Sequence, residues 1–189
     1  MSMLSFSPDK IELAKGITIA QYRELVVGRK KDEIADFIRQ RFTERYITPL
    51  ETEKKNGFCI MAVCCLMIET LESFYHGWPN TKNKSESAFC FFFDRNAQFS
   101  AFHGHAHNFY SHVRCGILHQ GETTGGWLIR RGGHLFDSSS KTINATKFLN
   151  TLKSSLNNYC NDLKGAEWND ALWKNLRRKI DAIVKNCCQ

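Results

Sequence analysis

Apolar residues recur at helical spacing along most of the chain. The first helical pattern runs from Asp32 to Pro49, where Asp32 suits the N-terminal cap and Pro49 ends the helix. Its apolar positions lie three or four residues apart: Ile34, Phe37, Ile38, Phe42 and Tyr46. Residues 1–31 are polar with weak periodicity, and they predict a peripheral N-terminal segment.

The central helix is predicted over residues 58–75. It contains an unbroken apolar run from Phe58 to Ile68, and a helix without a polar face is surrounded by protein. The run is too short to cross a bilayer, which needs about 20 residues, so we expect no membrane contact. Glu69 and Glu72 follow the run and are expected to mark the end of the helix that reaches solvent.

Three further amphipathic helices are predicted, over residues 106–119, 144–163 and 167–184. The stretch 87–102 is rich in phenylalanine, and its apolar run at 89–93 fits either a strand or a helical turn. We assign this stretch to a helix, which brings the bundle to five or six helices.

One β element is predicted between these helices. Trp127–Arg131 and His134–Asp137 have the pattern of two short strands joined by a two-residue glycine turn. The fold class is therefore an all-α bundle with a small inserted β-hairpin near 127–137. A chain of 189 residues has the length of a single domain, which ends in a C-terminal helical segment at 166–189.

The net charge of +7 favours a polyanionic partner, of which nucleic acid is the commonest. The basic residues fall in small groups, which solvated helix faces also produce, so a basic protein without such a partner stays an alternative. The eight cysteines include no CxxC pair, and no signal peptide is expected at the start. We expect free thiols and a cytoplasmic location.

The segment that carries chemistry lies between residues 103 and 122, where five of the seven histidines are found. On an ideal helix, Phe109 faces the core, whereas Arg114 and His119 lie about 140° apart on the two edges of a mostly polar strip. Ser111 and Cys115 lie on that strip. The two edge residues can grip one phosphodiester laid across it, or meet across a two-fold interface. Their truncation should hardly change stability.

This block resembles a known family. It reads YSHVRCGILHQGET from Tyr110 to Thr123 and GWLIRR from Gly126 to Arg131, and it contains the spacing R-x4-H. It is similar to a bacterial subfamily of the HEPN domains, which are small helical bundles tied to RNA cleavage and to toxin and defence systems. The resemblance covers about residues 32–165 and implies a HEPN-like bundle within a single domain spanning 1–189.

The resemblance implies a metal-independent endoribonuclease that acts as a homodimer without a cofactor. Arg114 would hold the scissile phosphate, and His119 would be the general base or acid, at the bottom of a cleft between two protomers. An antitoxin or a nucleotidyltransferase is the partner protein that such a family allows. The position after the arginine is usually Asn, Asp or His, whereas here it is Cys115, whose thiol is a weaker hydrogen-bonding group.

Other residues of the block are candidates for supporting roles. His112, Ser111, Cys115 and Glu122 flank the motif and are expected to support it. Trp127, Arg130 and Arg131 are candidates for stacking on RNA or clamping it. The alternative for Trp127 is the inward face of the hairpin.

Two other classes of function remain open. The bundle would serve as a non-catalytic RNA-binding or protein-binding module if the motif does no chemistry. Alternatively, His103, His105 and His107 would bind a transition metal, since alternate positions of an extended strand share a face. No acidic residue or suitably spaced cysteine completes that set, and Gly104 suggests a turn.

Overall fold

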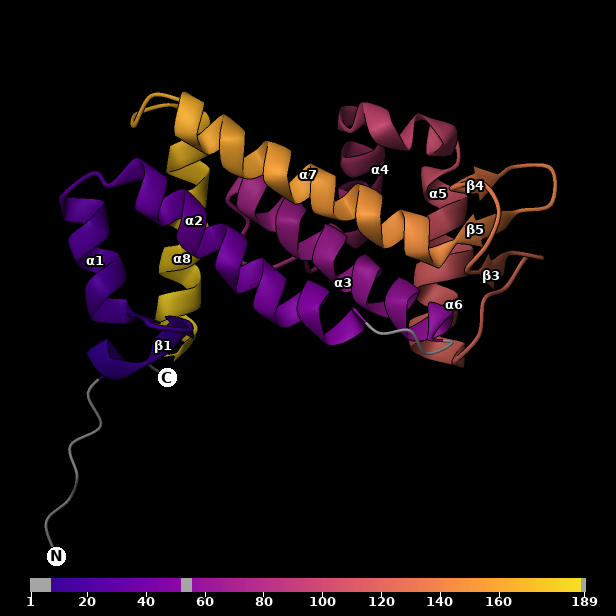
Figure 1. The fold of residues 1–189 in the computed structure, drawn as a ribbon, viewed down its shortest axis with the longest axis horizontal. Helices are drawn as coiled ribbons and strands as arrows, with labels where there is room; N and C mark the ends of the chain where they lie inside the picture. Colours follow the sequence, from indigo (N-terminus) through magenta and orange to yellow (C-terminus); the bar gives the residue numbers. More distant parts are fainter. Residues whose placement is uncertain (1–7, 52–55, 188–189) are drawn as a thin grey trace, which may run out of the picture.

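The computed structural model describes residues 8–51 and 56–187, and it confirms a mostly helical bundle with a small β insertion (Figure 1). The helices are α1 (Ile19–Val27), α2 (Lys31–Phe42), α3 (Gly57–His76), α4 (Ser85–Arg95), α5 (Ala106–Phe109), α6 (Cys115–Gln120), α7 (Ala145–Gly165) and α8 (Ala171–Cys187). The strands are β1 (Glu12–Ala14), β2 (Ile17–Thr18), β3 (Leu128–Arg130), β4 (Phe136–Asp137) and β5 (Thr142–Asn144).

Helix α3 is the centre of the bundle and packs against α4, α7 and α8. It is long and apolar enough to cross a membrane by length and composition alone, but 61% of its apolar window is buried inside the protein. The apolar side chains of α3 therefore serve mainly to pack against the neighbouring helices. The expectation that Glu69 and Glu72 reach solvent is wrong: they are 7% and 0% exposed, because each carboxylate is paired with an arginine.

The phenylalanine-rich stretch is helical, as assigned from the sequence. It forms α4 and a 3-10 helix over Ala97–Phe102. Its buried rings meet those of Phe109 and Phe148, so that α4, α5 and α7 share one aromatic cluster. The seven fully buried members are Phe89, Phe92, Phe93, Phe99, Phe102, Phe109 and Phe148. This cluster holds the motif-bearing segment against the bundle.

The predicted hairpin over 127–137 is wrong. β5 lies between the two expected partners, with β3 parallel on one side and β4 antiparallel on the other. The true hairpin turn is at 138–141, where the carboxylate of Asp137 accepts hydrogen bonds from Ser139 and Ser140. The side chain of Asn144 donates to the carbonyl of Gly133 at 3.0 Å, which holds the glycine segment in a longer loop.

The N-terminal and C-terminal segments meet at the end of the molecule far from β3–β5 (Figure 1). Leu13, Ile19 and Tyr22 are buried in the common core, so the N-terminal segment is peripheral in position but contributes to the core. The C-terminal segment forms α8, whose Trp173 is fully buried. The first seven and the last two residues of these predicted segments lie outside the described residues.

Candidate functional site

The motif lies on one continuous helical stretch that changes its geometry in the middle. Between α5 and α6, residues 110–114 form a π-helical turn, in which the N–H of Cys115 bonds the carbonyl of Tyr110. A π turn holds an extra residue and occurs frequently at functional sites. The extra residue changes the helical register, so the positions of α6 relative to α5 differ from those of an ideal helix.

Arg114 is held by a buried carboxylate of the central helix. Its Nε donates to Oε1 of Glu69 at 2.7 Å. The other oxygen of Glu69 accepts from Ser85 at 2.8 Å and from Thr81 at 3.2 Å. Glu69 therefore ties α3, the start of α4 and the motif helix together, and it fixes the direction of the guanidinium. Sequence reasoning missed this role, although an acidic residue in an apolar helix signals a buried partner.

Part of the guanidinium remains open to a ligand. Nη1 lies 4.0 Å from the sulfur of Cys115, and the ring of Tyr110 lies 5.6 Å from the guanidinium carbon. Nη2 has no hydrogen-bond partner within 8–51 and 56–187. The arginine side chain is 16% exposed. A planar fork anchored at one nitrogen and open at another suits an anionic oxygen such as a phosphate.

His119 is in the last turn of α6 and its side chain is exposed. Gly121 ends the helix directly after it in the left-handed conformation, at φ 70°. Residues five apart on an α-helix face directions about 140° apart, so Arg114 and His119 of one copy lie on different sides of α6. Both are accessible, as expected for the strip, but Arg114 is much less exposed than the ideal helix predicts.

Truncation of Arg114 is expected to cost stability, contrary to the expectation from the sequence. Arg114→Ala leaves Oε1 of the buried Glu69 without its donor, which costs about 1–3 kcal/mol. His119→Ala should stay within about 0.5 kcal/mol, because the side chain is exposed. Urea unfolding of both variants checks this difference, and equal free energies of unfolding would contradict the anchoring role of the ion pair.

His112 and the glycines of the block hold the loop after α6 in place. Nδ1 of His112 lies 3.0 Å from the hydroxyl of Thr124, whose N–H bonds the His112 carbonyl. A side chain at Gly125 would meet the His112 ring at 2.6 Å, and one at Gly116 would meet the carbonyl oxygen of Glu122 at 2.5 Å. These residues therefore position the loop. Ser111 is half-buried in the π turn.

The residues proposed to hold RNA near β3 have different environments. Trp127 is 3% exposed and stacks on Phe136 at 5.1 Å, so it faces the core and is not available to a base. Arg131 is bound to Thr146 and Asn56. Arg130 is exposed, and its guanidinium donates to the carbonyl of Ile129. Of these three residues, Arg130 alone suits the proposed contact.

The three histidines of the metal alternative have separate partners. His103 bonds the carbonyl of Phe93 at 2.9 Å, His105 meets the ring of Phe136, and His107 pairs with Glu86. In the part of the chain that the structure describes, no group of three or more His, Cys, Asp or Glu side chains is close enough to hold a metal ion. The structure thus does not bring this set together.

The site is therefore defined by the chain's own geometry. It consists of Arg114 fixed by Glu69, with Cys115 beside it and the exposed His119 five residues further along. Comparisons with protein-family models, with curated proteins and with solved structures find no match to this chain.

Proposed function

We propose that this protein is a HEPN-like, metal-independent endoribonuclease of toxin or defence type, with Arg114 and His119 acting at a cleft between two copies. The observation that carries the proposal is the anchored arginine. Glu69 holds its Nε, while Nη2 has no hydrogen-bond partner among the described residues, and the same helical stretch ends near an exposed histidine. A net charge of +7 favours the approach of RNA.

The reaction would use the RNA's own 2′-hydroxyl as nucleophile. A histidine takes the proton from this hydroxyl, the oxygen attacks the adjacent phosphorus, and the bond from phosphorus to the 5′-oxygen breaks. A protonated histidine returns a proton to that leaving oxygen. The guanidinium of Arg114 hydrogen-bonds the phosphate oxygens as negative charge develops on them. The products are a 2′,3′-cyclic phosphate and a free 5′-hydroxyl.

A two-fold dimer supports this chemistry. In one copy Arg114 and His119 face different sides of α6, so a second copy is needed to place an arginine and a histidine around one phosphate. Leu66 of α3 and Leu118 of α6 are 44% and 42% exposed, and exposed leucines near the motif suit an interface between copies. Light scattering should give twice 21.8 kDa at micromolar concentration. A mass of one copy would contradict the composite site.

Cleavage of a single-stranded RNA in EDTA tests the proposed function. The parent protein should cleave it and leave a 2′,3′-cyclic phosphate, and His119→Ala should lower the rate by about 10²–10⁴-fold. The matched control is His134→Ala, because His134 is also exposed but lies in the loop between β3 and β4. The control should cleave like the parent.

Two outcomes would overturn the proposal. One is cleavage that needs a stoichiometric metal and stops on chelation. The other is a His119→Ala variant that cleaves as fast as the parent. RNA that binds in an Arg114-dependent manner without being cut would instead replace the nuclease by the non-catalytic RNA-binding module.

A further inference from the structure

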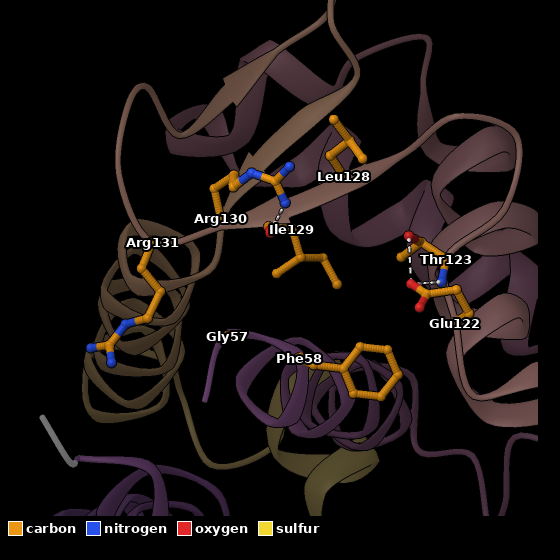
Figure 2. Close-up of a pocket in the computed structure, with 8 residues that line it drawn as sticks. All are labelled: Gly57, Phe58, Glu122, Thr123, Leu128, Ile129, Arg130 and Arg131. Atoms are coloured by element: carbon orange, nitrogen blue, oxygen red, sulfur yellow. Dashed lines mark hydrogen bonds between the residues drawn. The ribbon is translucent and has the colours of Figure 1, made fainter. Parts of the chain in front are cut away.

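A cavity of about 440 Å³ lies beside the candidate site (Figure 2). Its walls are the start of α3, strand β3 and the loop that follows α6. Glu122 and Thr123 of that loop line it, and they come directly after the turn that carries His119. Two lining residues of the cavity are therefore close in the chain to the proposed catalytic His119.

One side of this cavity is apolar and open to water. Phe58 of α3 and Leu128 of β3 are 38% and 41% exposed, and Ile129 lies between them. Figure 2 shows the flat ring of Phe58 directed toward the Glu122 side of the opening. An exposed aromatic ring next to aliphatic side chains is a surface on which a flat heterocycle can stack.

The other side carries one anionic and one cationic group. Oε1 of Glu122 accepts the N–H of Thr123 at 3.0 Å, whereas Oε2 has no hydrogen-bond partner among the described residues. Arg130 stands at the rim with an exposed guanidinium. Arg131 also lines the cavity, but its guanidinium already donates to Thr146 and Asn56. The cavity thus offers a free carboxylate oxygen and a separate cation.

We propose that this cavity binds a guanine base of the RNA, with Phe58 stacked on the base and Glu122 bonded to its Watson–Crick edge. A carboxylate only accepts hydrogen bonds. Guanine presents two adjacent donors on that edge, N1–H and N2–H, whereas adenine, cytosine and uracil each place an acceptor beside a single donor group. Arg130 would contact a phosphate next to the bound nucleotide. This inference rests on the proposed function, because it takes RNA as the ligand.

Binding of non-cleavable RNA tests this inference separately from catalysis. The probes are four fluorescent 2′-O-methyl hexamers, UUGUUU, UUAUUU, UUCUUU and UUUUUU, which lack the attacking hydroxyl. The parent protein should bind the guanine hexamer about tenfold more tightly than the other three. Glu122→Gln should remove most of that preference, because an amide nitrogen then faces one of the guanine donors. A failure to cleave ordinary RNA would leave these affinities interpretable.

Phe58→Ala and Phe91→Ala form the matched pair for the stacking contact. Both truncate an exposed phenylalanine of a helix, but Phe91 lies on α4 outside the cavity. Phe58→Ala should weaken binding of the guanine hexamer about tenfold, and Phe91→Ala should leave it unchanged. Both variants should keep the melting temperature close to that of the parent.

Three results would overturn the guanine site. The first is equal affinity of the parent for all four hexamers. The second is equal binding by Phe58→Ala and Phe91→Ala. The third is a Phe58→Ala variant that becomes monomeric while its RNA affinities stay unchanged, since the cavity would then be an interface between copies. If the parent cleaves RNA but shows no base preference, this inference falls while the proposed function stands.

Discussion

Phe109→Ala is expected to lower the free energy of unfolding by about 3–5 kcal/mol. The ring is fully buried at the centre of the aromatic cluster. It stacks on Phe148 of α7 at 5.6 Å and meets Phe93 of α4 edge-on at 5.1 Å. Truncation leaves a cavity among rigid rings that belong to different elements, so the surroundings can collapse only in part.

Urea unfolding of Phe109→Ala and Phe91→Ala measures this effect against a matched control. Phe91 is 45% exposed, and its ring meets those of His76 and Trp78 at the surface, so its truncation should cost about 1 kcal/mol. Because Phe109 lies one turn before Arg114, its loss should also loosen the candidate site. Equal costs for the two variants would show that the cluster does not hold the motif helix.

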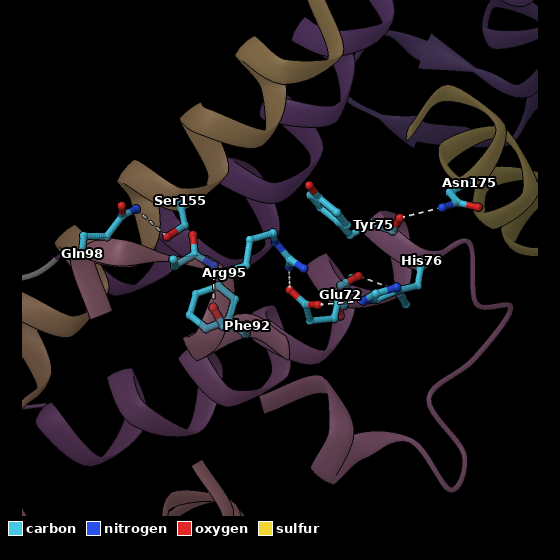
Figure 3. Close-up of polar contacts among 11 residues, drawn as sticks. Glu72, Tyr75, His76, Phe92, Arg95, Gln98, Ser155 and Asn175 are labelled. Atoms are coloured by element: carbon cyan, nitrogen blue, oxygen red, sulfur yellow. Dashed lines mark hydrogen bonds and ion pairs between the residues drawn. The ribbon is translucent and has the colours of Figure 1, made fainter. Parts of the chain in front are cut away.

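Arg95→Met is expected to destabilise the protein by about 3–5 kcal/mol at pH 8, because it leaves a buried carboxylate without its cation. Figure 3 shows the cluster around this pair. Glu72 has no exposed surface and accepts a hydrogen bond from Arg95, whose guanidinium carbon lies 3.7 Å from the centre of the Tyr75 ring. The second oxygen of Glu72 lies 3.3 Å from Nε2 of His76.

The destabilisation caused by Arg95→Met should depend on pH. Burial raises the pKa of Glu72 from 4.5 to about 7, although Arg95 acts in the opposite direction. The folded state therefore binds the proton of Glu72 more tightly than the unfolded state does. The stability that this proton contributes is fully present below pH 4.5 and is lost as the pH rises through about 7. Without Arg95 the pKa rises further, so stability should fall more steeply with pH in the variant than in the parent.

Denaturation at pH 5 and pH 8 tests this prediction. Arg95→Met should cost clearly less at pH 5, where Glu72 takes up a proton. The double variant Arg95→Met with Glu72→Gln should lose most of the pH-dependent part. Arg23→Met is the control, because its pair with Asp9 is exposed on both sides and should be worth less than about 1 kcal/mol. A cost that is the same at both pH values would contradict a buried charge as its origin.

The helices were predictable because their signal is local. An apolar residue every three or four positions gives α2 and α7 directly, and the apolar run gives the buried α3. Helix α1, which Thr18 caps, was not predicted. Its periodicity is weak because only Ile19 and Tyr22 of its nine residues are buried. Phe109 was placed on the core face correctly, because it precedes the π turn.

The sheet was not predictable from local pattern. Two glycines between short apolar runs favour a hairpin of β3 with β4. The strand order, however, depends on which strands pair, and here β5 pairs with both. Ile143 is fully buried between β3 and β4, and Asn144 both caps α7 and binds Gly133. The pairing therefore depends on residues of β5, which lie outside the predicted hairpin, and a turn signal between β3 and β4 alone cannot predict it.

The candidate site also has one part that the local sequence predicted and one part that it did not. The sequence by itself determined that histidines and Arg114 gather on one helix beside a glycine-rich loop, because spacing along a helix is a property of neighbouring residues. Only the tertiary structure decided that Glu69, 45 positions earlier, anchors Arg114 and that Trp127 is buried. It also decided that Phe58 and Glu122 line the same cavity. The physical reason is that ion pairs and cavities form between distant segments, whose approach the packing of the whole core sets.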